Sequence, residues 1–158
     1  MKPFAILAAA GPVDLSDAAG LFRAYADSLP IDLGYQGFES ELAALPGKYA
    51  PPAGALLIAR TPIGEAVGCV ALRPIDGDGI CEMKRLYVRP EARGLGLGGA
   101  LIAAILHAAR EAGYKEMRLD TLPTMRAALA MYRQAGFREI SAYYPTPVYG
   151  TIFLSLKL

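Results

Sequence analysis

The chain has 158 residues, of which 54% are hydrophobic, and a formal net charge of +1 at pH 7. This length is typical of a single domain, here residues 1–158, whose core is large enough to fold without disulfides or metal. The near-zero charge argues against a general binder of nucleic acid or anionic membrane, because such proteins carry a basic excess. Two cysteines and one histidine are too few for a disulfide framework or a metal-ligand cluster. We expect a cytoplasmic protein.

The N-terminal part is predicted to form a strand followed by two helices. The apolar run at residues 4–9 is too short for a secretory signal, so we expect it to be the first strand. Asp14 or Ser16 can cap a first helix, which Pro30 ends. A second, shorter helix should stop at the Pro46-Gly47 pair.

The middle of the chain is predicted to form an antiparallel meander of three strands. These lie at residues 55–59, 66–72 and 80–88. The third strand changes phase, since its apolar residues are Cys81 and Met83 at the start but Leu86 and Val88 at the end. Strict alternation cannot place all four on one face. One extra residue near positions 84–85 restores the phase and predicts a β-bulge.

The most informative stretch joins the third strand of this meander to a helix. A basic turn at residues 89–93 precedes glycines at 94, 96, 98 and 99, and an apolar run begins at Ala100. The first N–H groups of a helix have no partner within it, the helix dipole favours negative charge there, and glycines let a phosphate approach the backbone. Arg93 adds a cation whose forked donors suit phosphate. The stretch therefore predicts a site for a phosphate-bearing cofactor.

The rest of the chain is predicted to complete the sheet. The helix after the glycines should end at Gly113 and lead to a strand at residues 115–121. The order of strand, helix and strand implies that this strand is parallel to the one at 80–88. Thr124 can cap the next helix, which Gly136 ends. Two further strands are expected at residues 137–140 and 151–157.

The glycines also allow a second interpretation. Gly94, Gly96 and Gly99 satisfy the dinucleotide-binding pattern, and Asp120 lies where an acid that binds a ribose would be expected. In that pattern, however, the first glycine directly follows the strand, whereas the turn at residues 89–93 intervenes here. The chain also lacks a succession of further βα units. An NAD(P)-binding oxidoreductase is therefore the weaker interpretation.

The segment Arg93-Gly94-Leu95-Gly96-Leu97-Gly98 fits the pattern Arg/Gln-x-x-Gly-x-Gly/Ala. Together with the preceding residues 81–92, it resembles the acetyl-CoA pyrophosphate loop of the GNAT (GCN5-related N-acetyltransferase) superfamily. Residues 128–137 resemble the later helix and turn of that family, in which Tyr132 matches a tyrosine that often serves as general acid. The two segments occur in the family's order, and the resemblance covers nearly the whole chain.

This resemblance implies an α/β fold. Its central sheet is mixed and mostly antiparallel, the strands at residues 80–88 and 115–121 form its parallel pair, and about four helices flank it. The implied activity is direct transfer of an acetyl group from acetyl-CoA to an amine of a small molecule, peptide or protein, without a metal. We expect a monomer or homodimer with neither nucleic-acid nor membrane partners.

The resemblance also assigns roles to individual residues. A phenol with a pKa near 10 is protonated at pH 7 and can donate to a CoA thiolate, so Tyr132 is the candidate acid. Glu82 is the candidate base. The residues implied to bind acetyl-CoA are Leu86, Tyr87, Val88, Arg93, Gly94, Leu95, Gly96, Leu97, Gly98, Gly99 and Ala128. Arg85 and two tyrosines of the aromatic, proline-rich stretch at 143–149, Tyr144 and Tyr149, are expected to bind the acceptor.

Simpler structural interpretations of these residues stay open. Tyr132 can be an ordinary packed aromatic residue of a helix. Glu82 can be a strand carboxylate paired with Lys84 or Arg85. A domain that binds acyl-CoA without catalysis would keep the glycine loop and lack the acceptor chemistry.

Overall fold

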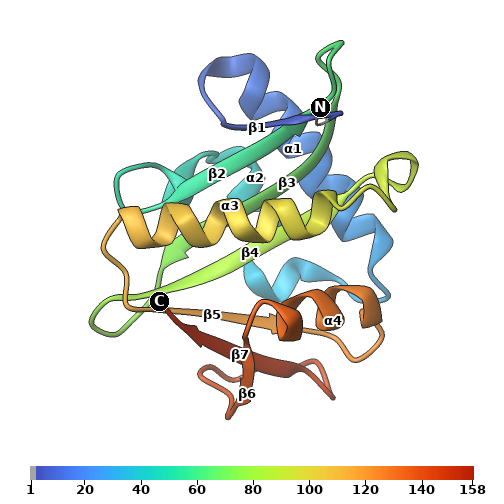
Figure 1. Cartoon of the computed structure of the whole chain (residues 1–158). Helices are drawn as coiled ribbons and strands as arrows, with labels where there is room; N and C mark the ends of the chain where they lie inside the picture. The colour runs from blue at the N-terminus through green and yellow to red at the C-terminus, as the bar shows by residue number, and fades with distance from the viewer. Residues whose placement is uncertain (1–2) are drawn as a thin grey trace.

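The computed structural model, which describes residues 3–158, contains one seven-stranded sheet in the order β1-β2-β3-β4-β5-β7-β6. Neighbouring strands are antiparallel except for the parallel pair β4 and β5 (Figure 1). The strands are β1 (Ala5–Ala8), β2 (Ala55–Arg60), β3 (Ala66–Pro74), β4 (Ile80–Val88), β5 (Glu116–Thr121), β6 (Arg138–Ile140) and β7 (Ile152–Lys157). The predicted mixed sheet and its parallel pair are confirmed.

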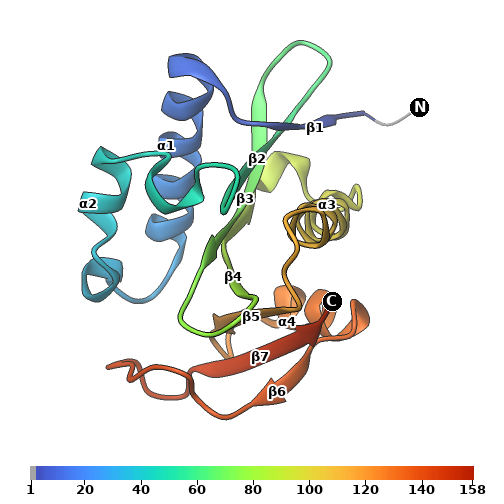
Figure 2. The same cartoon turned by 90° about the vertical axis from the view of Figure 1, so that its left-hand side faces the viewer.

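Helices cover both faces of this sheet (Figures 1 and 2). Helices α1 (Gly11–Ser28) and α2 (Phe38–Ala43) lie on one face, and α3 (Leu97–Glu111) lies on the other, next to α4 (Arg126–Gln134). Short 3-10 turns occur at Leu33–Gln36, Gly47–Tyr49 and Pro90–Ala92. Each face has its own hydrophobic core, with α1 and α2 over one and α3 and α4 over the other.

The helix boundaries differ from the prediction at several points. Helix α1 begins before Asp14 and Ser16, with Pro12 in its first turn, where the fixed φ of proline suits a helix. The predicted caps of α1 are therefore wrong. So is the predicted cap of α4, because that helix begins two residues after Thr124 and has no side-chain cap. Helix α3 starts within the glycines, at Leu97 rather than at Ala100.

Helix α3 lies unusually close to β3, because a glycine of that strand faces it. A Cβ atom at Gly68 would come within 3.1 Å of Leu101 and 3.3 Å of Leu97. Leu101 and Ile105 are fully buried, whereas Ala112 at the helix end is exposed. The close approach fixes the start of α3, and with it the glycine loop, over the sheet.

The predicted bulge in β4 is present. Cys69 of β3 pairs with Tyr87 and Ala71 pairs with Lys84, so a step of two residues along β3 corresponds to a step of three residues along β4. Arg85 takes the left-handed conformation at φ 62°, which a residue with a side chain rarely adopts. The bulge shifts the side-chain alternation of β4, as its sequence indicated.

Strands β4 and β5 stay paired only at their first residues. The parallel pairing joins Ile80–Glu82 to residues 116–118. Beyond Glu82 the two strands have no paired residues, although β4 continues to Val88 beside β3. The later half of β4 therefore has a backbone edge without a neighbouring strand.

Candidate active site

A cavity of about 590 Å³ lies between the unpaired half of β4, the start of α3 and helix α4. All the residues predicted to bind the cofactor line it except Leu95, whose side chain is exposed. Tyr25 of α1 and Arg126 of α4 line it as well. Three segments far apart in the sequence thus form its walls.

The glycine loop forms one end of this cavity. Gly94 and Gly96 have φ values of 81° and 77°, in the left-handed region that favours glycine. Gly96 is the N-cap of α3, and no side chain caps the helix. The first N–H groups of α3 are therefore available to an anion at the cavity end.

Arg93 lies beside the loop with part of its guanidinium engaged. Its Nε donates a hydrogen bond to the Val88 carbonyl at 2.9 Å, and the group lies over the Tyr87 ring, 5.8 Å from its centre. These contacts orient the fork next to the free N–H groups of α3.

Gly98 allows α3 and α4 to pack closely. A Cβ atom at this position would come within 2.8 Å of the Met131 sulfur. Met131 and Ala128 both line the cavity from α4. Gly98 therefore sets the separation of two of the cavity walls.

Tyr132 follows Ala128 by four residues on α4 and so lies on the same helix face, although it is buried behind the residues that line the cavity and is not one of them. It is 6% exposed, and its ring meets the Phe137 ring edge-on at 5.9 Å between centres. The helix ends in a Schellman motif, in which the N–H of Phe137 donates to the Tyr132 carbonyl and that of Gly136 to the Arg133 carbonyl, both at 3.0 Å. Phe137 therefore packs against Tyr132 at the end of the helix.

The Tyr132 hydroxyl has no hydrogen-bond partner within residues 3–158. Over the same residues, no fully buried side-chain nitrogen or oxygen lacks a partner, so this hydroxyl keeps some contact with solvent. Burial raises the pKa of Tyr132 above its usual value, and the neighbouring Tyr25 and Asp120 raise it further. The phenol is therefore a protonated donor at neutral pH.

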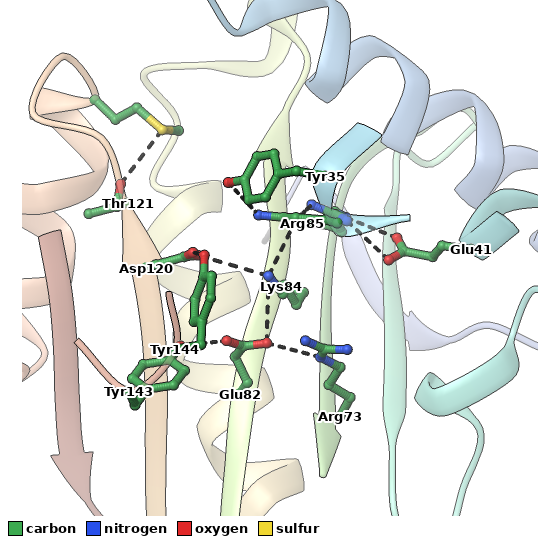
Figure 3. A network of polar contacts seen from close by, with 12 residues as sticks. Tyr35, Glu41, Arg73, Glu82, Lys84, Arg85, Asp120, Thr121, Tyr143 and Tyr144 are labelled. Carbon is green, nitrogen blue, oxygen red and sulfur yellow. Dashed lines mark hydrogen bonds and ion pairs between the residues drawn. The ribbon is translucent and has the colours of Figure 1, made fainter. Parts of the chain in front are cut away.

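Glu82 lies at the point where β4 and β5 separate, and it is almost completely buried. One carboxylate oxygen accepts from Arg73 Nε at 2.9 Å and lies 3.5 Å from Lys84 Nζ. The other oxygen accepts from the Tyr143 hydroxyl (Figure 3). Both oxygens are thus occupied by protein donors.

A second carboxylate, Asp120 of β5, faces Glu82 across Lys84 (Figure 3). One of its oxygens lies 3.9 Å from Lys84 Nζ, and the other accepts a hydrogen bond from the Tyr144 hydroxyl. Burial and the bond to Asp120 both raise the pKa of Tyr144. The loop between β6 and β7 is therefore joined to both separating strands by adjacent tyrosines.

Arg85 is buried, and its guanidinium is bound to α2 and the preceding 3-10 turn. Its Nε and Nη2 donate to the Glu41 carboxylate at 2.9 and 3.0 Å, and its Nη1 donates to the Gln36 side chain at 2.9 Å. The bulge turns this side chain away from the cavity of about 590 Å³ towards the opposite face.

A polar groove follows β4 on the face where these charged side chains lie. One part of it has a volume of about 320 Å³ and is lined by Arg85, Lys84 and Tyr144 among others. Tyr149, by contrast, is fully exposed and lines none of the cavities described. The structure therefore brings Arg85 and Tyr144 together and leaves Tyr149 outside.

Sequence reasoning did not identify several residues of this region. Tyr25 belongs to no motif of the sequence, yet it lines the larger cavity, and burial raises its pKa to about 12. No sequence signal marks Arg73, and the sequence places Tyr143 only in the aromatic stretch expected near the acceptor, without its link to Glu82. The sequence suggests for Asp120 only the role of a ribose ligand. Their partners lie on other strands, so only the sheet register brings them together.

Residues 3–158 contain no group of three or more His, Cys, Asp or Glu side chains placed to hold a metal ion. No helix in that range is long and apolar enough to cross a membrane.

Comparisons with known proteins agree with this geometry. The sequence profile of the Acetyltransferase (GNAT) family matches residues 20–137. An uncharacterised N-acetyltransferase of Schizosaccharomyces pombe is 42% identical over all of this chain and 98% of its own length. A Klebsiella pneumoniae protein described as an acyl-CoA N-acyltransferase superposes with a TM-score of 0.76 and 31% identity, covering 98% of this chain and 97% of its own. The acetyltransferase yncA of Salmonella typhimurium, solved with its cofactor acetyl-CoA, has a TM-score of 0.69 at 18% identity, over 98% and 93% of the chains.

Proposed function

Because this chain belongs to the GNAT family of acetyltransferases and is an acyltransferase enzyme, we propose that it transfers an acetyl group from acetyl-CoA directly to an amine of a small molecule or peptide. The cavity of about 590 Å³ carries the proposal. Its glycine end offers unpaired N–H groups, and its middle runs along the free edge of β4. A protonated phenol lies on the helix that forms its far wall.

The cavity fits the parts of acetyl-CoA. The N–H groups at residues 94–99 would hold the pyrophosphate, with Arg93 and Arg126 as cations. The free backbone of residues 86–88 would hold the pantetheine amides and donate to the thioester oxygen. Bound acetyl-CoA supplies the activated acetyl group as a thioester.

We assign Tyr132 as the general acid. Its hydroxyl is protonated at neutral pH because burial raises its pKa, and it has no protein partner within residues 3–158 that would hold the proton. The phenol gives its proton to the departing sulfur. Phe137 and the helix end fix the direction of the ring.

We assign Glu82 as the proton acceptor, acting through Tyr143. The Glu82 carboxylate is buried under three donors, so the acceptor amine does not reach it directly. The Tyr143 hydroxyl can give its own proton to Glu82 while it takes one from a chain of water molecules that leads to the amine. Such a transfer would leave the amine neutral for attack on the thioester.

Calorimetry and a thiol-release assay test the proposed function together. We expect acetyl-CoA to bind and to release thiol only when a suitable primary amine is present. Binding of acetyl-CoA with no turnover on any amine would indicate an acyl-CoA-binding domain without catalysis. Binding of NADPH in place of acetyl-CoA would indicate the oxidoreductase.

A further inference from the structure

Arg73, Glu82 and Arg118 form one row across three adjacent strands. Arg73 of β3 pairs with Glu82 of β4, and Glu82 pairs with Arg118 of β5. Directly opposed residues share a face of the sheet, so two arginines flank one buried carboxylate on the side of the polar groove. Arg73 Nε donates to Glu82 at 2.9 Å, while Arg118 Nε donates to Glu116 at 2.7 Å.

Both arginines keep their terminal nitrogens free. Within residues 3–158, neither Nη1 nor Nη2 of Arg73 or Arg118 has a hydrogen-bond partner. The two side chains are 31% and 25% exposed, and none of their nitrogens is both buried and unpaired. Each guanidinium is thus fixed through its Nε and presents its outer edge to solvent.

These two outer edges open on one cavity of about 290 Å³. It is also lined by Lys48, by Asp76 and by Tyr143, over whose ring the Arg118 guanidinium lies at 5.5 Å. Glu82 is the other carboxylate in the lining, and its oxygens are already occupied. The cavity therefore has an excess of oriented cationic donors, an arrangement that suits a bidentate carboxylate.

The other cations of the groove do not offer such a site. Every donor-bearing nitrogen of the Arg85 guanidinium contacts Glu41 or Gln36. Lys84 lies between Glu82 and Asp120. A ligand carboxylate would have to displace these partners, whereas it would add to Arg73 and Arg118 without breaking a bond.

We propose that Arg73 and Arg118 form a carboxylate clamp that selects acceptors bearing a carboxylate distant from the reacting amine. The inference rests on the proposed function, which places the reacting amine near Leu86. Residue 82 lies four positions earlier on β4, about 13 Å at roughly 3.3 Å per residue, or somewhat less because of the bulge. An α-amino acid is too short to span this interval, and an ω-amino acid or a short peptide fits it.

Matched pairs of amines test the clamp by turnover. The wild-type enzyme would be assayed with ω-amino acids from 4-aminobutyrate to 8-aminooctanoate, each beside the alkylamine of equal carbon number. Among the longer amines, we expect kcat/KM to be higher for the ω-amino acid than for the alkylamine of equal carbon number. Arg73→Gln and Arg118→Gln should each lower that value by about 10- to 100-fold, through KM, as expected for a lost hydrogen bond to a charged group. In Arg118→Gln, turnover of the alkylamines and the acetyl-CoA affinity should change by less than about threefold. Arg73→Gln also removes a donor to Glu82, so it should in addition lower kcat for both members of each pair.

Two further variants keep the test decisive. Arg118→Lys leaves the Arg73–Glu82 pair intact, so it measures the clamp even if Arg73→Gln unfolds the protein. Arg110→Gln removes an exposed arginine at the far end of α3 and should change nothing. Equal kcat/KM for both members of each pair, or a preference for polycationic amines, would overturn the proposal.

Binding measured by NMR separates this inference from the proposed function. Titration with 6-aminohexanoate should shift the Nε–Hε resonances of Arg73 and Arg118, and Arg110 should not respond. Shifts without any acetylation would reject the proposed activity and keep the clamp. Acetylation of amines without these shifts would reject the clamp and keep the activity.

Discussion

Gly96 and Gly113 lie at opposite ends of α3 and share a left-handed backbone, with φ values of 77° and 89°. Neither would place a Cβ atom within 4 Å of a neighbour. Only Gly96 lines the acetyl-CoA cavity. Substitutions at these two glycines should therefore cause similar backbone strain, and only the substitution at Gly96 should also affect cofactor binding.

Gly96→Val should weaken acetyl-CoA binding, because it strains the loop and places a branched side chain where the phosphate approaches. Gly113→Val should cost a similar amount of stability, about 1–2 kcal/mol for the left-handed conformation. Calorimetry and thermal unfolding measure the two effects. A similar rise in Kd for both variants would show that the loop does not contact the cofactor.

Tyr132→Phe should lower kcat by ~10²–10⁴, with little change in acetyl-CoA affinity, because it removes only the proton donor. Tyr114→Phe is the matched control, since its hydroxyl donates to the Ala53 carbonyl outside the cavity. Retention of kcat within a few-fold in Tyr132→Phe would place the acid elsewhere or make another step rate-limiting.

The pH dependence of kcat gives a second test of the phenol. Burial raises the pKa of Tyr132 above its ordinary value of 10.0, so the proton stays bound as pH rises towards that value. We therefore expect kcat to show no loss from ionisation of Tyr132 between pH 8 and about 10. A fall in kcat in this range that is absent in Tyr132→Phe would contradict the assignment.

Tyr144→Ala should raise KM for the acceptor, because Tyr144 lines the polar groove and its hydroxyl holds Asp120. Tyr149→Ala provides a control on the same loop, since its side chain is fully exposed. Steady-state kinetics with both substrates would measure the difference. An equal change in both variants, or a change confined to KM for acetyl-CoA, would reject Tyr144 as an acceptor residue.

Glu116→Gln should remove part of the pH dependence of stability. Hydrogen bonds from Arg118 and Ser155 lower the pKa of Glu116 below its ordinary value of 4.5. A lowered pKa in the folded state stabilises the protein above that ordinary value, and this stabilisation is lost as pH falls through the folded-state pKa. The Tm difference between wild type and Glu116→Gln should therefore shrink from pH 6 towards pH 3. A constant difference would contradict this.

Much of the fold could be predicted because its signals are local. The phase change in residues 80–88 revealed the bulge, since side-chain direction alternates residue by residue. The cavity end was predictable from Gly94 and Gly96, whose conformations few other residues tolerate. The helix starts were less predictable. Thr124 has capping chemistry but lies one residue before the N-cap of α4, and Asp14 lies inside α1, where its carboxylate accepts from the N–H of the N-cap residue Ala10.

The polar groove could not be predicted from the sequence in the same way. Arg73, Glu82 and Arg118 are neighbours only because of the register of three strands. Tyr144 and Tyr149 looked equivalent in sequence, yet the path of the loop buries one beside Asp120 and exposes the other. Such contacts depend on tertiary geometry, which no local pattern of residues encodes.

The short pairing of β4 with β5 has a mechanical consequence. Within residues 3–158, strand pairing between the half-sheet β1 to β4 and the half-sheet β5 to β7 is confined to Ile80–Glu82 and residues 116–118. The seam beyond them is where the protein should open most readily, and its β4 amides should exchange fastest with deuterium. A ligand bound along this free edge of β4 would take the place of a neighbouring strand and so connect the two half-sheets. Saturation with acetyl-CoA should therefore slow exchange on both sides of the seam at once, including in β7, which lines no part of the cavity.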